Sequence, residues 1–186
     1  LGFEKAYWAA LPGLCITLVL WAALPGLPRA PHGKAHRWDW APFRPVWRPM
    51  VLLYFLVVIR SVVQVVFNQF LALYFHLDRG FSIREASLVL TLFLVGGALG
   101  GFAGGNLADR FGGKRIVVFS MIASTPFLVG FLATRGPLSL ASLFVGGLIL
   151  LFTVPVNVTM AQELVPGQSG TVSALMMGFA WGMAGL

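Results

Sequence analysis

The sequence predicts an all-α membrane protein, and its composition and the length of its apolar runs lead to that prediction. Only 10% of the 186 residues are charged and 58% are hydrophobic, with a mean hydropathy of +0.86, whereas soluble domains carry about 25% charged residues. The apolar residues form runs of about 20, which is the length that a helix needs to cross a bilayer core. A sheet with open edges would leave unpaired backbone groups in lipid, so helices are expected throughout.

Six segments are expected to cross the membrane: Ala6–Leu24, Met50–Phe75, Ala86–Ala108, Ile116–Thr134, Leu138–Ala161, and one that begins near Gly170 and is still apolar at Leu186. The chain does not begin with Met and shows no secretory signal, so we expect it to be an internal part of a longer membrane protein.

Local signals mark where some of these helices begin or bend. Ser82 and Glu85 form a Ser-x-x-Glu capping box ahead of the third segment, and Gly136-Pro137 predicts a tight turn between the fourth and fifth. Pro126 and Pro155 fall inside segments, where neighbouring helices or a cavity can satisfy the carbonyls that a proline leaves free.

The only long connection, residues 25–49, holds six prolines and five Lys or Arg. Proline fixes φ and lacks a backbone donor, so the composition predicts a basic linker on the lipid headgroups, anchored by Trp38, Trp40, Phe43 and Trp47. A partner-binding segment is the alternative. Together with residues 109–115, this linker holds eight basic residues, against four in the loops of the opposite side. The linker is therefore expected to be cytoplasmic. The net charge of +7 then reflects orientation in the membrane and not a nucleic-acid partner.

A charged, glycine-rich hinge, GNLADRFGGKR at residues 105–115, separates the third and fourth segments. It resembles the loop signature of the major facilitator superfamily, in which Gly, three residues, Asp, Arg or Lys, any residue and Gly are followed by two basic residues. The residues that match are Gly105, Asp109, Arg110, Gly112 and Lys114. Gly113 stands where a basic residue is usual.

This resemblance implies a major facilitator-type helical bundle. Residues 1–24 would be the last helix of an N-terminal half, residues 25–49 the cytoplasmic linker, and residues 50–186 a C-terminal half without its last helix. In that superfamily the hinge acts as a cytoplasmic latch, with Arg110 and Lys114 as charge partners of Asp109 and a helix outside this chain beside it. The alternative is that the hinge only sets orientation.

Further segments resemble the fosmidomycin resistance branch of the superfamily, namely residues 60–61, 70–75, 161–167, 170–175 and 178–182. That resemblance implies proton-coupled efflux of a drug or small anionic compound across a bacterial inner membrane. The implied partners are a small-molecule substrate, protons, the lipid bilayer and the N-terminal half, with no cofactor. A sugar, nitrate or organic-anion carrier, or a non-transporting membrane subunit of the same fold, remains the alternative.

Arg60 is the strongest candidate for a substrate site, because a charge near the bilayer midplane costs at least about 2.5–3.5 kcal/mol. Gln64 and Asn68 follow at i+4 and i+8 and share its helical face. The three either line a substrate cavity, where Arg60 suits an anion, or place Arg60 against a carboxylate of the N-terminal half.

Other candidate residues carry two interpretations each. Thr153 and Asn157, again four residues apart, predict either a second cavity wall or a hydrogen bond between packed helices. Glu163 is either linked to proton movement or a structural anchor.

Two glycine series on the third segment predict close helix packing that lets helices slide; they comprise Gly96, Gly100 and Gly104, and Gly97 and Gly101. No metal cluster or nucleophile–base constellation points to an enzyme.

Overall fold

The computed structural model describes residues 10–23 and 41–185, and every regular element within these ranges is a helix. The chain divides into two units, residues 1–39 and 40–186. In the first unit, α1 (Ala10–Ala23) is apolar on all sides, which is typical of a helix that lies in lipid or in a protein core. Most of the predicted linker, including Trp38 and Trp40, lies outside the described residues.

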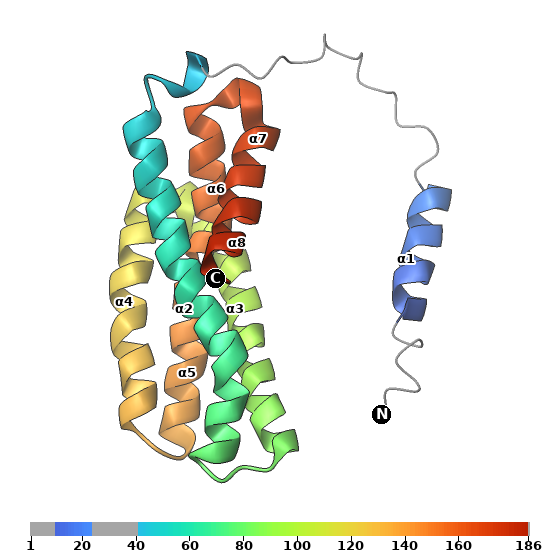
Figure 1. Ribbon diagram of the computed structural model, residues 1–186, viewed down its shortest axis with the longest axis vertical. Helices are drawn as coiled ribbons and strands as arrows, with labels where there is room; N and C mark the ends of the chain where they lie inside the picture. The colour runs from blue at the N-terminus through green and yellow to red at the C-terminus, as the bar shows by residue number, and fades with distance from the viewer. Residues whose placement is uncertain (1–9, 24–40, 186) are drawn as a thin grey trace. The chain divides into compact units, whose positions relative to one another are not determined.

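The second unit is a bundle of long helices (Figure 1). Four stretches are long and apolar enough to cross a membrane: α2 (Trp47–Leu77), α3 (Ile83–Phe111), α4 (Gly113–Ala133), and α5 (Pro137–Leu150) with α6 (Thr153–Leu164). The sixth predicted segment consists of the 3₁₀ turn η3 (Pro166–Gln168), α7 (Ser169–Ser173), the π-helical η4 (Ala174–Phe179) and α8 (Ala180–Ala184). The described residues thus confirm an all-α, multi-pass membrane fold.

The linker ends earlier than the sequence predicts. After a 3₁₀ turn, η2 (Ala41–Phe43), helix α2 begins at Trp47 and not at Met50. Pro49 is therefore the third residue of α2, in the first turn, where a missing N–H leaves no helical bond unmade. Trp47 and Arg48 belong to the helix and not to the linker.

The predicted hinge at residues 105–115 is almost entirely helical. Asp109 and Arg110 lie in the last turn of α3, and Lys114 lies in the first turn of α4. Gly112 alone separates the two helices, with φ at +88° and ψ at 135°. A side chain is disfavoured at that φ, so glycine allows the chain to reverse within a single residue.

The fifth predicted segment is broken between α5 and α6, at Leu151 and Phe152. Pro155 explains the break, because it has no N–H to bond the carbonyl of Leu151 four residues earlier. That carbonyl accepts from the N–H of Val154 instead, at 3.2 Å. Pro126 causes no such break, and α4 continues through it.

The core of the second unit lies in separate clusters along the bundle. One cluster joins the first half of α2 to α6, α7 and α8 and includes Val57, Ala161 and Met176. Another joins the far end of α2 to α3, α4 and α5 through Phe75, Phe93 and Phe131. The first turn of α2 lies at the same end of the bundle as the end of α6 (Figure 1), so these two helices pack antiparallel.

Candidate functional site

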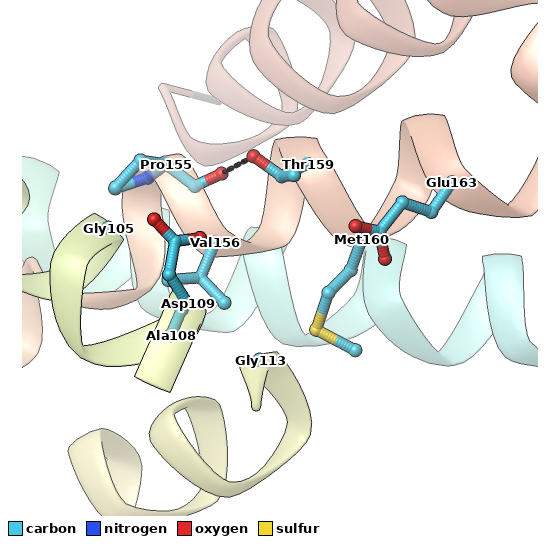
Figure 2. A pocket seen from close by; sticks show the side chains of 9 residues that line it. All are labelled: Gly105, Ala108, Asp109, Gly113, Pro155, Val156, Thr159, Met160 and Glu163. Atoms are coloured by element: carbon cyan, nitrogen blue, oxygen red, sulfur yellow. Dashed lines mark hydrogen bonds between the residues drawn. The ribbon is translucent and has the colours of Figure 1, made fainter. Parts of the chain in front are cut away.

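The glycine-rich motif at residues 105–115 lies beside α6, and a pocket of about 80 Å³ lies between them (Figure 2). The motif contributes residues from the end of α3 and the first residue of α4, and α6 contributes the opposite wall. The lining residues are Gly105, Ala108, Asp109, Gly113, Pro155, Val156, Thr159, Met160 and Glu163. The Thr159 hydroxyl donates to the Pro155 carbonyl at 3.0 Å, as Figure 2 shows, so that it is bonded within its own helix.

The surroundings of Asp109 differ from those expected from the sequence. We expected its neighbouring helix to lie outside this chain, but α6 of the same chain forms the other side of its pocket. Among the described residues, neither Arg110 nor Lys114 forms an ion pair with Asp109. The second carboxylate of the pocket, Glu163, also has no ion pair there. Asp109 and Arg110 are consecutive on one helix and therefore point in different directions.

Gly113 departs from the motif for a structural reason. A Cβ atom at this position would lie 2.7 Å from the Met160 sulfur and 3.1 Å from a Val156 methyl carbon. A basic side chain, which the superfamily pattern has here, would therefore require the flexible Met160 side chain to move. In contrast, a Cβ atom on Gly105 would meet nothing within 4 Å.

Arg60 forms a second polar cluster inside the bundle. Its side chain is 2% exposed and donates to Oε1 of Gln64 at 2.6 Å and to the Ser61 hydroxyl at 2.9 Å. Both partners are neutral and lie on the same helix, and the Nε atom of Arg60 is buried without a partner. Asn68 continues this face, and its buried Oδ1 atom is also unpartnered. Within the described residues, the guanidinium charge is thus balanced by no carboxylate.

Thr153 and Asn157 are both buried on α6, at 0% and 2% exposure. The Thr153 hydroxyl donates to the Leu150 carbonyl at 3.0 Å, across the break in its own segment. The sequence left open a second cavity wall or a hydrogen bond between packed helices, and this bond within one segment corresponds to neither. Asn157 keeps its Oδ1 atom buried without a partner.

Arg60 on α2 and Asn157 on α6 belong to two helices that pack against the same core cluster. Each of the two side chains has a buried polar atom without a partner.

The first glycine series of α3 lies directly against the backbone at the α5–α6 break. A Cβ atom on Gly100 would lie 2.0 Å from the Leu148 carbonyl oxygen, and one on Gly104 would lie 2.3 Å from that of Phe152. One on Gly96 would lie 2.8 Å from the Phe144 carbonyl oxygen. The second series is less uniform. A Cβ atom on Gly97 would lie 2.1 Å from a Leu151 methyl carbon, whereas one on Gly101 would lie 3.9 Å from the Leu151 carbonyl oxygen, an ordinary contact.

Two residues that join helices were not identified from the sequence. Arg79 bonds the end of α4, and Ser120 of α4 bonds carbonyls at the end of α5. In the sequence, the signal for Ser120 is a serine inside an apolar run. Arg79 has no comparable signal, because it resembles an ordinary charged loop residue.

The sequence pattern of the Major Facilitator Superfamily matches residues 1–186. The chain belongs to this superfamily. Several of its curated relatives are named as transporters. No solved structure matches it significantly.

Several curated superfamily transporters resemble the chain over part of their length. The uncharacterized MFS-type transporter YfnC of Bacillus subtilis is 42% identical over 106 residues, which is 56% of this chain and 26% of YfnC. The fosmidomycin resistance protein of Escherichia coli is 37% identical over 111 residues, 58% of this chain and 26% of that protein. The 4-hydroxybenzoate transporter PcaK of Pseudomonas putida is 34% identical over 144 residues, 75% of this chain and 32% of PcaK. The chain thus spans about a quarter to a third of these relatives.

Proposed function

We propose that the protein is a secondary active transporter that works by alternating access and exports a drug or small anionic compound in exchange for protons. The observation that carries the proposal is Arg60, a buried guanidinium whose described partners are neutral. A buried charge without a counter-charge is costly. An anionic substrate would supply that counter-charge when Arg60 becomes accessible, and a planar guanidinium suits a carboxylate or phosphonate.

The pocket at Asp109 supports the alternating-access part of this proposal. Two carboxylates face it from α3 and α6 without a cationic partner among the described residues. Asp109 would act as the latch, forming and breaking contacts at the cytoplasmic end, and Glu163 is the candidate for proton linkage. The protein would lie in a bacterial inner membrane with the residue 25–49 linker in the cytoplasm.

Export of a fosmidomycin-like compound is favoured over the alternatives by the likeness to the fosmidomycin resistance protein over 58% of this chain. The likeness to PcaK extends over 75% of the chain and favours the second candidate, carriage of an aromatic carboxylate. Arg60 suits both substrates because both are anions. A neutral sugar would leave the charge of the Arg60 guanidinium unbalanced.

The test replaces Arg60 in the intact protein. Arg60→Ala should abolish transport because the anion loses its counter-charge, and Arg60→Lys should restore it poorly because an ammonium ion lacks the guanidinium fork. Proton-driven fosmidomycin export and 4-hydroxybenzoate uptake, measured in vesicles, distinguish the two candidates. Gln69→Ala is the matched control, because Gln69 is an exposed polar residue on the same helix.

Full transport by a membrane-inserted Arg60→Ala variant would exclude Arg60 from the substrate site. No proton-driven transport of either compound by the native protein would favour the non-transporting alternative.

A further inference from the structure

The break between α5 and α6 leaves backbone carbonyls that no helix N–H satisfies in the usual way. Leu151 has φ −88° and ψ 0°, outside helical geometry, and Pro155 supplies no donor. Carbonyl groups freed in this way inside a membrane must find other donors. Backbone N–H groups reach two of them in shorter turns, Phe152 to Ile149 and Val154 to Leu151, each at 3.2 Å. Side-chain hydroxyl groups add further bonds, one from α6 and one from a different helix.

Ser120 of α4 provides the donor from the other helix. Its hydroxyl bonds the carbonyl of Ile149 and lies 3.4 Å from the carbonyl oxygen of Leu150, while Thr153 donates to Leu150 at 3.0 Å. Ser120 is fully buried, so water does not compete for this bond. The Ser120 hydroxyl of α4 thus bonds the end of α5 directly before the break.

The other side of the break lies against α3. Gly100 and Gly104 contact the backbone of Leu148 and Phe152 so closely that no side chain fits between them. The segment can therefore pivot over a smooth glycine surface, whereas movement away from α4 breaks the Ser120 bond. Beyond the break, α6 carries the buried Asn157 and, at its end, the Thr159 and Glu163 wall of the Asp109 pocket.

We propose that Ser120 is a positioning residue for transport. By bonding carbonyls at the end of α5 from a neighbouring helix, it stabilises the conformation in which α6 closes the Asp109 pocket, and it releases α6 when the pocket opens. The proposal rests on the proposed transport function, but its structural part is measurable without a substrate. Ser120 contacts neither the pocket nor the Arg60 cluster and would act through the position of α6.

The experiment compares Ser120→Thr with Ser120→Val in the intact protein. These side chains have nearly the same shape and add the same methyl group, so only Thr keeps the hydroxyl. Ser139→Ala is the matched control, because the buried Ser139 also bonds α5 to α4, donating to the Phe131 carbonyl at 2.9 Å, but far from the break. The readouts are the maximal transport rate, KM, the melting temperature, and the rate at which a thiol reagent labels a cysteine placed at Thr159 with native cysteines removed.

We expect Ser120→Val to label about five-fold faster at Thr159 than Ser120→Thr, because one neutral hydrogen bond is worth about 1 kcal/mol. Its maximal transport rate should fall by a similar factor while KM stays nearly constant. Ser139→Ala should lower the melting temperature without changing labelling at Thr159.

Equal labelling of the Thr and Val variants, or the same labelling change in Ser139→Ala, would overturn the proposal and leave Ser120 with a packing role. If the native protein transports nothing but the labelling difference is present, the proposed function fails while the positioning role of Ser120 stands.

Discussion

The two ends of the helix bundle are built differently. At one end, which we call the Arg79 end, the turns between α2 and α3 and between α4 and α5 are joined by side chains. At the other, the Asp109 end, the turn between α3 and α4 meets α6 across a pocket lined by two carboxylates. The contrast indicates which end holds the bundle together and which end is free to change.

Arg79 accounts for most of the first end. Its guanidinium donates to the Tyr74 hydroxyl at 3.0 Å and to the carbonyl groups of Thr134 at 2.9 Å and Phe131 at 3.3 Å. It also lies 5.2 Å from the centre of the Tyr74 ring and within 6 Å of the Phe75 and Phe131 rings. One cation thus satisfies carbonyls at the end of α4 and packs on the aromatic cluster beneath it.

At the Asp109 end, Gln162 of α6 donates to the Ser173 hydroxyl of α7 at 2.7 Å, but the described residues show no such tie from Asp109 or Glu163. Its carboxylates have no ion pair there, and the break at Leu151 and Phe152 directly precedes α6, which lines the pocket. An end that must open and close requires contacts weak enough to break, whereas the opposite end does not.

The largest expected effect is on stability at the Arg79 end. Arg79→Ala removes three hydrogen bonds from a charged donor together with its aromatic contacts, so the free energy of unfolding should fall by about 3–5 kcal/mol. Thermal unfolding of the purified intact protein would measure it. Arg84→Ala is the control, because Arg84 is an exposed arginine at the same end. Equal melting temperatures for the two variants would remove the contrast between the ends.

The next effect is on the conformational equilibrium at the Asp109 end. Asp109→Asn keeps the shape and deletes the charge, so it should shift the protein toward inward-open states by about 1–3 kcal/mol, or roughly 5- to 150-fold. Most transport should be lost while substrate affinity from the cytoplasmic side changes only a few-fold. Thiol labelling of a cysteine at Val51, near the start of α2, reports the shift. Unchanged labelling with intact transport would leave the motif as an orientation signal.

The smallest effect concerns the start of α3 at the Arg79 end. The Ser82 hydroxyl accepts from the Glu85 N–H at 3.3 Å, and Glu85 accepts from the Ser82 N–H at 2.9 Å. Ser82→Ala should therefore lower the free energy of unfolding by about 1 kcal/mol and leave transport unchanged. Thermal unfolding and vesicle transport together test this, with Ser87→Ala as the control, because Ser87 bonds within the helix. A loss of transport without a loss of stability would show that the Arg79 end also moves.

Local patterns in the sequence predicted the features that depend on neighbouring residues. The capping box at Ser82 and Glu85, and the turn at Gly136 with its φ of +71°, are present as expected. The two prolines show where local reasoning fails, because Pro126 leaves α4 continuous whereas Pro155 coincides with a break. At the break, the Ile149 carbonyl also accepts from the Ser120 hydroxyl, which is 29 residues away in sequence.

The candidate sites also combine features that neighbouring residues determine with features that helix packing determines. The sequence spacing placed Arg60 and Gln64 on one face, and the structure joins them by a hydrogen bond. The position of α6 beside Asp109 depends on how three helices pack, and no spacing within the motif contains that information.

The arginine buried in α2 has a consequence for how the protein enters the membrane. A helix must insert before its tertiary partners surround it, and a central arginine opposes insertion by about 2.5–3.5 kcal/mol. Helix α2 spans 31 residues with a hydropathy of 2.4 in its most apolar window, and it is about 46 Å long, longer than the hydrocarbon core. This surplus of apolar residues counters the cost of the arginine during insertion. Polar substitutions on the lipid face of α2 are thus disfavoured by biogenesis, even where they touch nothing in the folded protein.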